Sequence, residues 1–324
     1  MLNELHYGLD IGGTKIAIGI YDASWNLLDS WRQPTPASDR DALFGCLQQM
    51  VALADERYGC ARTLGVGIPG VLHADGTLHA ANLPGLKGCQ LEAALARLFG
   101  QAVPVDNDCR CFARSESAAG GACAEVADAF VAPIGTGAGG GLIINHQVVT
   151  GANMAAGEWG HMPLPAPLQV RYQLPLFECG CGATGCMEHY VSGTGLGRLY
   201  VLAGGPEQAD SHAWLKAYRH RQGPALRAFE MFMELLGAGL ATIIKVTGVS
   251  RIVVGGGVAM IDEIMAALPA AVARQSIPGL APCEVVRAIF LDSGGMRGAA
   301  LLGAEHNALA GQPASDNSTH RGQP

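Results

Sequence analysis

Three glycine-rich turns carry residue types that bind phosphate. Each follows a short apolar run, and they span Asp10–Lys15, Gly135–Gly141 and Gly255–Gly257. Glycine has no β-carbon, so the backbone N–H groups of such turns can approach an anion closely. In the first turn, the Asp10 carboxylate can hold magnesium or its waters, the Thr14 hydroxyl can bond to phosphate, and Lys15 adds positive charge. Three such turns around one cleft predict a nucleotide site.

The candidate phosphate ligands come from these turns and from the run that precedes the first one. They are Gly8, Asp10, Gly12, Gly13, Thr14, Lys15, Gly135, Thr136, Gly137, Gly139, Gly140, Gly141, Gly256 and Gly257, with Asp10 also a candidate magnesium ligand. Ordinary hairpin turns are the alternative for any single glycine cluster. Three clusters, one of which also holds an acid, a hydroxyl and a lysine, favour the phosphate interpretation.

Two well-known nucleotide motifs are matched only in part. Gly8–Lys15 resembles a P-loop, but its threonine and lysine stand in reverse order and an alternating β pattern follows. Gly135–Gly140 fits G-x-G-x-x-G, yet a strand pattern follows where a dinucleotide fold requires a helix. Both the P-loop and the dinucleotide interpretation are therefore disfavoured.

The segments around the turns predict a duplicated α/β architecture. An apolar run, a glycine turn and a second apolar run occur once in each half, at 7–21 and at 129–144. Such repetition predicts two halves that face each other with the nucleotide between them. Further strands are predicted at 64–68 and 251–254, helices at 41–58, 91–98, 225–246 and 259–274, and a proline-rich loop at 162–175. Alternating strands and helices are typical of the α/β class.

Length, composition and charge exclude several classes of protein. The chain has 324 residues, 49% hydrophobic and 15% charged, which favours a folded protein of two domains. A net charge of −7 argues against a nucleic-acid partner, because phosphate backbones require a basic face. The apolar segment 235–244 is too short to cross a membrane and the N-terminus lacks a signal pattern, so we expect a cytoplasmic protein. The tail 310–324 is predicted to be disordered.

Two further groups of residues have types and spacing suited to chemistry. Asp108 follows an apolar stretch and stands at a predicted helix start, where it can serve as a base or, like Asp106 and Asn107, as a helix cap. Three cysteines are spaced C-x-C-x-x-x-x-C among glycines, at Cys179, Cys181 and Cys186. They either wrap one tetrahedral metal or are unrelated thiols. A metal requires a fourth ligand from elsewhere in the chain.

Five motifs together resemble the ROK family of sugar kinases and sugar-responsive repressors. They are Asp10–Lys15, Asn107–Asp108, Gly135–Gly141, Gly157–His161 and Cys179–Glu188, and the resemblance covers nearly all of residues 7–305. It implies a two-lobed actin-like ATPase fold, α/β and ribonuclease H-like, with a ligand cleft between the lobes and a small zinc knuckle. The implied divisions are a small lobe at 1–118 completed by a helix at about 293–309, and a large lobe at 119–292 with a zinc-binding loop at 161–188.

The resemblance also implies roles for individual residues. Asp108 is implied to be the base that takes the proton of the attacking sugar hydroxyl, while magnesium shields the charge of ATP. The implied ligands of one structural zinc ion are His161, Cys179, Cys181 and Cys186. The implied sugar contacts are Gly70, Asn82, Asn107, Asp108, Glu158, His161 and Glu188. Beside Asp108, both Cys109 and Arg110 depart from what is usual in the family.

Three segments are most similar to the family members that phosphorylate N-acetyl-D-glucosamine. They are Ala81–Pro84, the long loop between His161 and Cys179, and Gly294–Ala300. The implied reaction is ATP-dependent formation of the sugar 6-phosphate by a homodimer that binds neither nucleic acid nor membranes. The alternative substrates are glucose, mannose and fructose.

Two other functions fit part of the pattern. A sugar-sensing repressor is disfavoured because the first glycine turn begins at residue 10, which leaves no room for an N-terminal DNA-binding domain, and because Asp10 and Asp108 are intact. Paired carboxylates also suggest glycoside hydrolysis, which the phosphate-binding turns disfavour.

Overall fold

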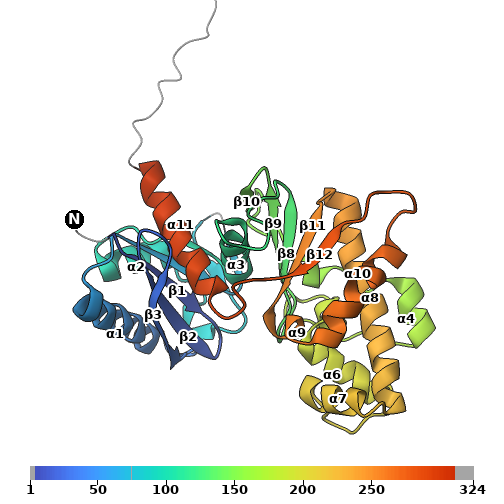
Figure 1. Cartoon of the computed structure of the whole chain (residues 1–324). Helices are drawn as coiled ribbons and strands as arrows, with labels where there is room; N and C mark the ends of the chain where they lie inside the picture. The colour runs from blue at the N-terminus through green and yellow to red at the C-terminus, as the bar shows by residue number, and fades with distance from the viewer. Residues whose placement is uncertain (1–3, 74, 311–324) are drawn as a thin grey trace, which may run out of the picture.

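The fold contains two five-stranded sheets built on the same plan. The computed structural model describes residues 4–73 and 75–310. The first sheet has the strand order β3-β2-β1-β4-β7 and the second has the order β10-β9-β8-β11-β12. In each sheet, three antiparallel strands are followed by two strands that run parallel to the central one. Figure 1 shows the first sheet on the left and the second to its right.

The repeated plan confirms the duplicated α/β architecture expected from the two strand–turn–strand segments. The strands of the first sheet are β1 (His6–Ile11), β2 (Lys15–Tyr21), β3 (Leu27–Pro34), β4 (Thr63–Ile68) and β7 (Val105–Asn107). Those of the second are β8 (Ala129–Pro133), β9 (Gly141–Ile144), β10 (Gln147–Val149), β11 (Arg251–Gly255) and β12 (Glu284–Arg287). A small hairpin adds β5 (Val71–Leu72) and β6 (Leu78–His79).

Helices surround the two sheets. In the first half they are α1 (Arg40–Tyr58), η1 (Pro84–Leu86), α2 (Leu91–Phe99) and α3 (Asp108–Ser117). The second half has η2 (Trp159–His161), α4 (Ala166–Tyr172), α5 (Glu188–Val191), α6 (Gly193–Leu202), α7 (Ser211–Arg219), α8 (Gly223–Thr247), α9 (Gly256–Ala259), α10 (Asp262–Gln275) and α11 (Gly294–Ala310). The predicted helices at 41–58, 91–98 and 225–246 are confirmed as α1, α2 and α8.

Two sequence predictions about the second half were wrong in detail. The segment 259–274 is not one helix, because α9 ends at Ala259 and α10 begins at Asp262. The proline-rich segment 162–175 is not all loop, since it contains α4. Pro165 precedes the first helical residue of α4, where the absent N–H of proline costs the helix no hydrogen bond.

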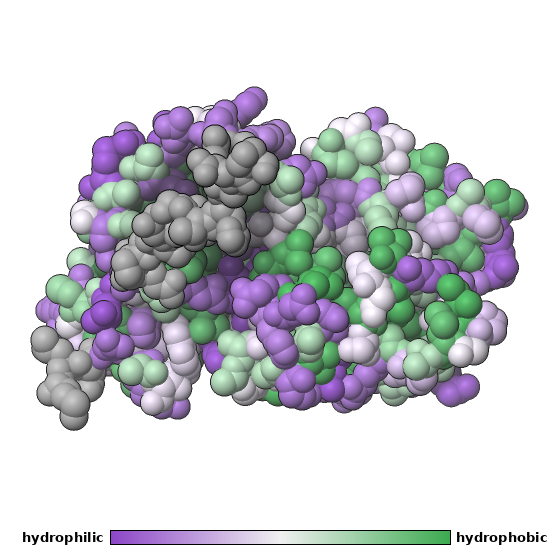
Figure 2. All heavy atoms as spheres, turned by 90° about the horizontal axis from the view of Figure 1, so that it is seen from above, coloured by the Kyte–Doolittle hydropathy of each residue, from purple (hydrophilic) through white to green (hydrophobic). Residues whose placement is uncertain are grey.

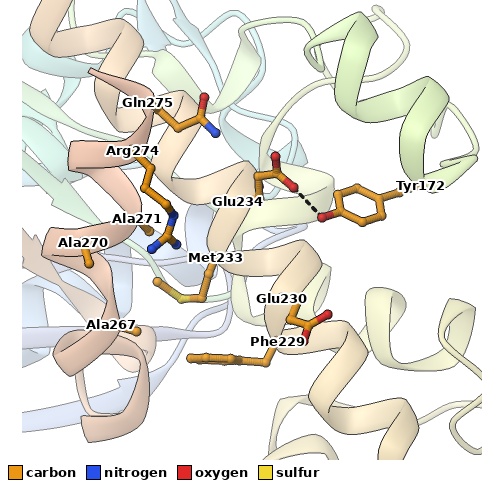
Figure 3. A pocket seen from close by; sticks show the side chains of 10 residues that line it. All are labelled: Tyr172, Phe229, Glu230, Met233, Glu234, Ala267, Ala270, Ala271, Arg274 and Gln275. Carbon is orange, nitrogen blue, oxygen red and sulfur yellow. Dashed lines mark hydrogen bonds between the residues drawn. The ribbon is translucent and has the colours of Figure 1, made fainter. Parts of the chain in front are cut away.

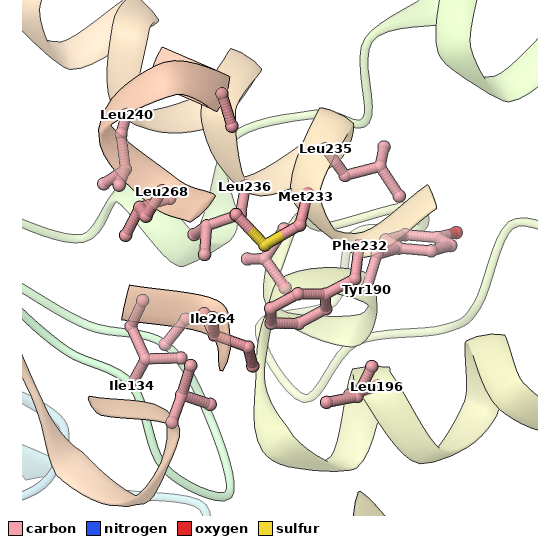
Figure 4. Close-up of a cluster of buried hydrophobic side chains, with 14 of the residues drawn as sticks. Ile134, Tyr190, Leu196, Phe232, Met233, Leu235, Leu236, Leu240, Ile264 and Leu268 are labelled. Atoms are coloured by element: carbon pink, nitrogen blue, oxygen red, sulfur yellow. The ribbon is translucent and has the colours of Figure 1, made fainter. Parts of the chain in front are cut away.

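The largest hydrophobic core lies in the second half, where helices rather than sheet faces supply most of the side chains. Figure 4 shows residues of α8 and α10 meeting those of α5 and α6, with Ile134 from the end of the second sheet. Phe232, Leu236 and Leu268 are completely buried there. A separate core fills the first half between its sheet and α1 and α2.

Helix α11 returns from the second half to pack on the first sheet. It crosses β1 and β4 at glycines: a Cβ on Gly8 would stand 1.8 Å from the Met296 carbonyl oxygen, and one on Gly65 would stand 2.0 Å from that of Ala299. Gly8 is therefore a packing residue under α11. Its place among the phosphate ligands stays a prediction, although the helix backbone of α11 fills the space beside its Cα.

Helix α3 joins the two halves of the molecule. It packs on α11 and on strands β8 and β9, and its Phe112 and Ala113 belong to a small core with the second sheet. The buried Glu116 carboxylate accepts hydrogen bonds from the backbone N–H groups of Ala122, Ile289 and Phe290. The lobe boundaries drawn from the sequence stay a prediction. The predicted disordered tail lies, from residue 311 on, outside the described residues.

The surface carries polar and apolar residues in different proportions at its two ends. In the view from above, hydrophilic residues predominate over much of the left half, and hydrophobic residues gather near the middle of the face (Figure 2). Among the described residues, no helix is both long enough and apolar enough to span a membrane.

Candidate active site

Asp10 stands near the end of β1, where the first glycine turn begins. The turn is closed by a hydrogen bond from the Gly12 N–H to the Lys15 carbonyl, 2.9 Å long. The Asp10 carboxylate lies against the start of α11, because a Cβ on Gly295 would be 2.5 Å from its Oδ2. Burial, reinforced by the negative charge of Asp108, raises the pKa of Asp10 to about 7, although Lys15 opposes the shift. Such a carboxylate gains from a nearby cation.

Asp108 is the first residue of α3, directly after β7. Asn107 caps this helix: its side-chain oxygen accepts the N–H groups of Cys109 at 2.9 Å and Arg110 at 3.3 Å. The capping alternative was therefore right for Asn107. Within the described residues, Oδ1 of Asp108 accepts a hydrogen bond from the Cys109 N–H at 2.8 Å. Burial raises the pKa of Asp108, and its free oxygen can accept a proton from a ligand.

The remaining first-half sugar candidates lie beside these two carboxylates. The Asn107 side-chain amide donates to the Gly70 carbonyl at 3.1 Å. Gly13 of the first turn lies against Asn82, whose Cβ would be 2.9 Å from a Cβ on Gly13. Gly70, Asn82 and Asn107 thus meet Asp108 and the first glycine turn at one end of the first sheet.

The second half contributes a cluster of carboxylates and one histidine. His161 Nε2 is 3.7 Å from a Glu158 oxygen, and His161 Nδ1 is 3.8 Å from a Glu188 oxygen. A Cβ on Gly137 would stand 2.9 Å from Glu188, so the second glycine turn touches this cluster. Burial raises the pKa of Glu158, with Asp108 adding to the rise and His161 opposing it. The negative charges of Glu158 and Asp108 therefore influence each other across the two halves.

His161 and three cysteines form a metal-binding arrangement. Their ligand atoms all lie within 4.8 Å of one another, at His161, Cys179, Cys181 and Cys186. The Cys179 sulfur is 3.5 Å from His161 Nδ1, and the Cys181 and Cys186 sulfurs are 3.6 Å apart. Ligand atoms around a tetrahedral zinc ion are roughly 3.4–3.8 Å apart, so the donor set and its spacing fit zinc.

The two ring nitrogens of His161 face different groups. Its Nδ1 faces Cys179, whereas its Nε2 faces Glu158. A zinc ion on Nδ1 would therefore leave Nε2 turned toward the carboxylates, where a sugar hydroxyl can reach it. The knuckle itself depends on Gly182 and Gly185, whose φ angles of 90° and 75° suit glycine best.

The second and third glycine turns lie in direct contact. The Val258 N–H donates to the Ile134 carbonyl at 3.0 Å, and a Cβ on Gly256 would stand 2.5 Å from that same oxygen. The glycines of these turns fall into two groups, those with open space beside them and those that are packed. Gly135 and Gly257 have open space on their Cα atoms, whereas packing fills the space at Gly139, Gly140 and Gly141, which meet Cys109, Phe130 and Ala113.

A pocket of about 830 Å³ opens between these two turns and helices α6, α7 and α9. The sequence candidates Gly135, Thr136 and Gly257 line it. The sequence analysis missed the rest of its wall, which includes Phe177, Gly193, Thr194, Arg198, Leu202, Asp210, Ser211, His212, Leu215, Met260 and Ile261. Apolar walls with a few polar groups suit a planar base with a ribose. The local signals that could have found this wall are the helix caps Ser192 and Asp210 and the glycines of α6 at Gly193, Gly195 and Gly197.

A second groove lies away from every candidate site residue. It holds about 570 Å³ between α8 and α10, and Figure 3 shows Tyr172 of α4 reaching in to donate a hydrogen bond to Glu234. Arg171 pairs with the same carboxylate. None of the predicted phosphate or sugar residues lines this groove.

Comparison with known proteins finds close relatives along nearly the whole chain. A protein of Shewanella sp. (strain ANA-3) named N-acetylgalactosamine kinase AgaK is 42% identical over 299 residues, which are 92% of this chain and 96% of that protein. N-acetyl-D-glucosamine kinase of Escherichia coli O9:H4 (strain HS) is 39% identical over 302 residues, 92% of this chain and 99% of that protein.

Solved structures show the same two-lobed fold. A ROK family glucokinase from Streptomyces griseus, in complex with glucose and AMPPNP, superimposes with a TM-score of 0.77 at 28% identity, over 93% of this chain and 99% of that one. A family model described as the ROK family matches residues 6–306. The chain belongs to the ROK family.

Proposed function

We propose that the protein is an ATP-dependent kinase that phosphorylates the 6-hydroxyl of an N-acetylhexosamine. The observation that carries the proposal is the surroundings of Asp108: its charge interacts with that of Glu158, and the next residue, Cys109, contacts Gly139 of the second glycine turn, whose Gly135 and Thr136 line the pocket. The relatives named N-acetylgalactosamine kinase and N-acetyl-D-glucosamine kinase support this chemistry.

The nucleotide would occupy the pocket of about 830 Å³ with its base between α6, α7 and α9. The open Cα atoms of Gly135 and Gly257 leave room for phosphate oxygens beside the backbone. From the first sheet, Lys15 and Thr14 are exposed at the tip of the first turn and complete the phosphate contacts. Binding of AMPPNP, an ATP analogue, by the Streptomyces griseus glucokinase supports this assignment.

The sugar would bind between the two groups of carboxylates. Glu158, Glu188 and His161 Nε2 accept or donate hydrogen bonds to ring hydroxyls, and Asn107 fixes the sugar relative to α3. Asp108 then accepts the proton of the 6-hydroxyl as that oxygen attacks the γ-phosphate. Magnesium bound with ATP, near Asp10, would neutralise charge on the transferred phosphoryl group.

The zinc ion would have a structural role. Four protein ligands leave no open coordination position for water or substrate. Since the knuckle carries Cys186 two residues before Glu188 and ends the loop that begins at His161, a bound zinc ion would hold two sugar-contacting side chains at a fixed separation.

Two epimers compete as the preferred substrate. We take N-acetyl-D-glucosamine as the first candidate, on the similarity of Ala81–Pro84 and Gly294–Ala300 to kinases of that sugar. N-acetyl-D-galactosamine is the second candidate, because the Shewanella relative is the more similar of the two at 42% against 39%. The two sugars differ only in the orientation of the 4-hydroxyl, which one or two hydrogen bonds can distinguish.

ADP release measured with a panel of sugars tests the proposal, with zinc quantified on the same sample. We expect one zinc per chain and a kcat/KM for an N-acetylhexosamine at least about tenfold above that for glucose, since one well-placed polar contact is worth 1–3 kcal/mol. Equal or better turnover of glucose would contradict the substrate class. Absence of turnover with every sugar would contradict the kinase itself.

A further inference from the structure

Arg110 is a fully buried cation beside the proposed sugar site, and it has no role in the mechanism above. Only 1% of the residue is exposed. Its Nε donates to Oδ1 of Asp106, which precedes α3, at 2.6 Å, and its Nη1 donates to the Met154 carbonyl at 2.9 Å. Burying a guanidinium is costly where its donors are unpaired. These two contacts pair Nε and Nη1, and the buried Nη2 has no hydrogen-bond partner among the described residues.

The two contacts of Arg110 reach different halves of the molecule. Asp106 belongs to β7, the strand that ends at Asn107 and leads into Asp108. Met154 lies in the loop 150–157, which follows β10 and leads directly into Glu158. The guanidinium therefore bridges the strand that positions the proposed base to the loop that positions a proposed sugar carboxylate.

The loop 150–157 has a conformation that needs support. Met154 has a left-handed backbone with φ of 58°, which is unfavourable for a residue with a side chain. The backbone hydrogen bonds around it are short-range, from the Met154 N–H to Gly151 and from the Ala156 N–H to Thr150, both 3.2 Å long. The Arg110 contact comes from 44 residues away and ties the loop to the rest of the fold.

Pairing with the Asp106 carboxylate does not by itself distinguish Arg110, because Arg114 makes the same kind of contact. It lies one turn further along α3 and is also buried. Its Nη2 is 3.6 Å from Asp106 and its Nε is 3.2 Å from Glu305, so it too pairs with the Asp106 carboxylate. What distinguishes Arg110 is its second contact, the hydrogen bond to the Met154 carbonyl.

We propose that Arg110 is a positioning residue for the sugar: it clamps the loop 150–157 against β7, so that Glu158 keeps a fixed place relative to Asn107 and Asp108. This inference rests on the proposed function. Because arginine has separate nitrogens for the two contacts and lysine has one, the clamp requires arginine at this position.

The variant R110K separates the clamp from simple structural support. Lysine can still pair with Asp106 of β7, but it cannot hold the Met154 carbonyl at the same time. We expect R110K to raise the KM for the sugar about tenfold and to leave the KM for ATP within about twofold, as one lost hydrogen bond to a charged group predicts. We expect faster amide hydrogen exchange of residues 150–157, measured by mass spectrometry.

R114K is the matched control, since it makes the same substitution on the same helix beside the same acid without a contact to the loop. We expect its sugar KM and loop exchange to equal those of the wild type. A wild-type sugar KM in R110K would overturn the inference while leaving the proposed function intact. If the wild type phosphorylates no sugar, the proposed function fails, and amide exchange of residues 150–157 still tests the clamp. Faster exchange in R110K but not in R114K supports the clamp, and unchanged exchange in R110K overturns it.

Discussion

At the residue scale, Asp108 combines burial with an unshared oxygen. Its carboxylate accepts a hydrogen bond from the Cys109 N–H, and burial raises its pKa. A base in a desolvated cleft takes a proton more readily than its reference pKa of about 3.9 suggests. The helix start leaves that base at the meeting point of β7, the second glycine turn and the carboxylate cluster.

The variant D108N tests this role. Asparagine keeps the shape of the side chain and an oxygen for the Cys109 N–H, but it cannot accept a proton. We expect kcat to fall by about 10²–10⁴, whereas the dissociation constant for the sugar, measured by calorimetry, changes little. A kcat close to that of the wild type would show that another group accepts the proton.

Residue types could be predicted from the sequence better than residue positions. Asp108 stood at a predicted helix start because an apolar run precedes it, and the structure begins α3 there. The packing of Gly8 could not be predicted, because the motif around it spans only a few residues, whereas its neighbour Met296 lies almost the whole chain away. Arg110 drew attention only as an unusual neighbour, since its contact with Met154 is long-range.

At the scale of elements, the cysteine knuckle at 179–186 shows how much of a metal site the spacing of residues can predict. The separation of three cysteines by glycines indicated a metal or unrelated thiols, and the structure brings the three sulfurs and His161 together. The histidine lies 18 residues before the first cysteine and α4 intervenes, so spacing alone could not select it. Which ring nitrogen faces the sulfurs depends on how η2 approaches the knuckle, and that is a matter of tertiary packing.

The packing of α11 on the first sheet leads to a prediction about Gly8. In G8A the new methyl group would meet the Met296 carbonyl at 1.8 Å, and neither backbone can move without separating β1 from α11. We expect the free energy of unfolding to fall by about 3 kcal/mol or more, read from denaturant titration.

G45A is the control for G8A, because Gly45 lies in α1 with nothing within 4 Å of a new Cβ. Alanine there should stabilise the helix by up to about 1 kcal/mol. If G8A unfolded like the wild type and instead raised the KM for ATP, Gly8 would be a phosphate ligand after all.

At the scale of the whole molecule, two sheets of one plan place three glycine turns around the same region. The duplication was visible in the sequence because each half repeats a strand, a glycine turn and a strand. The pocket wall from α6 and α7 was not, because neither helix belongs to the repeated strand, glycine turn and strand, although α6 contains Gly193, Gly195 and Gly197. Their place beside Gly135 and Gly257 arises from packing on α8.

The residues proposed for the reaction come from both halves of the molecule. Asp10 and Asp108 belong to the first sheet and its following helix, whereas Glu158, Glu188 and the pocket belong to the second half. Helix α3 contacts both, through α11 and through β8 and β9. A sugar and a triphosphate bound from opposite sides would therefore meet at the start of α3.

A crystal structure of the protein with N-acetyl-D-glucosamine and AMPPNP tests this account most directly, through the distance from the Asp108 carboxylate to the sugar O6. We predict a separation of about 2.6–3.2 Å, with the γ-phosphate on the other side of O6 and the second glycine turn beside the triphosphate. A sugar whose O6 lies out of hydrogen-bond reach of Asp108, with a different acidic side chain beside it, would contradict the account.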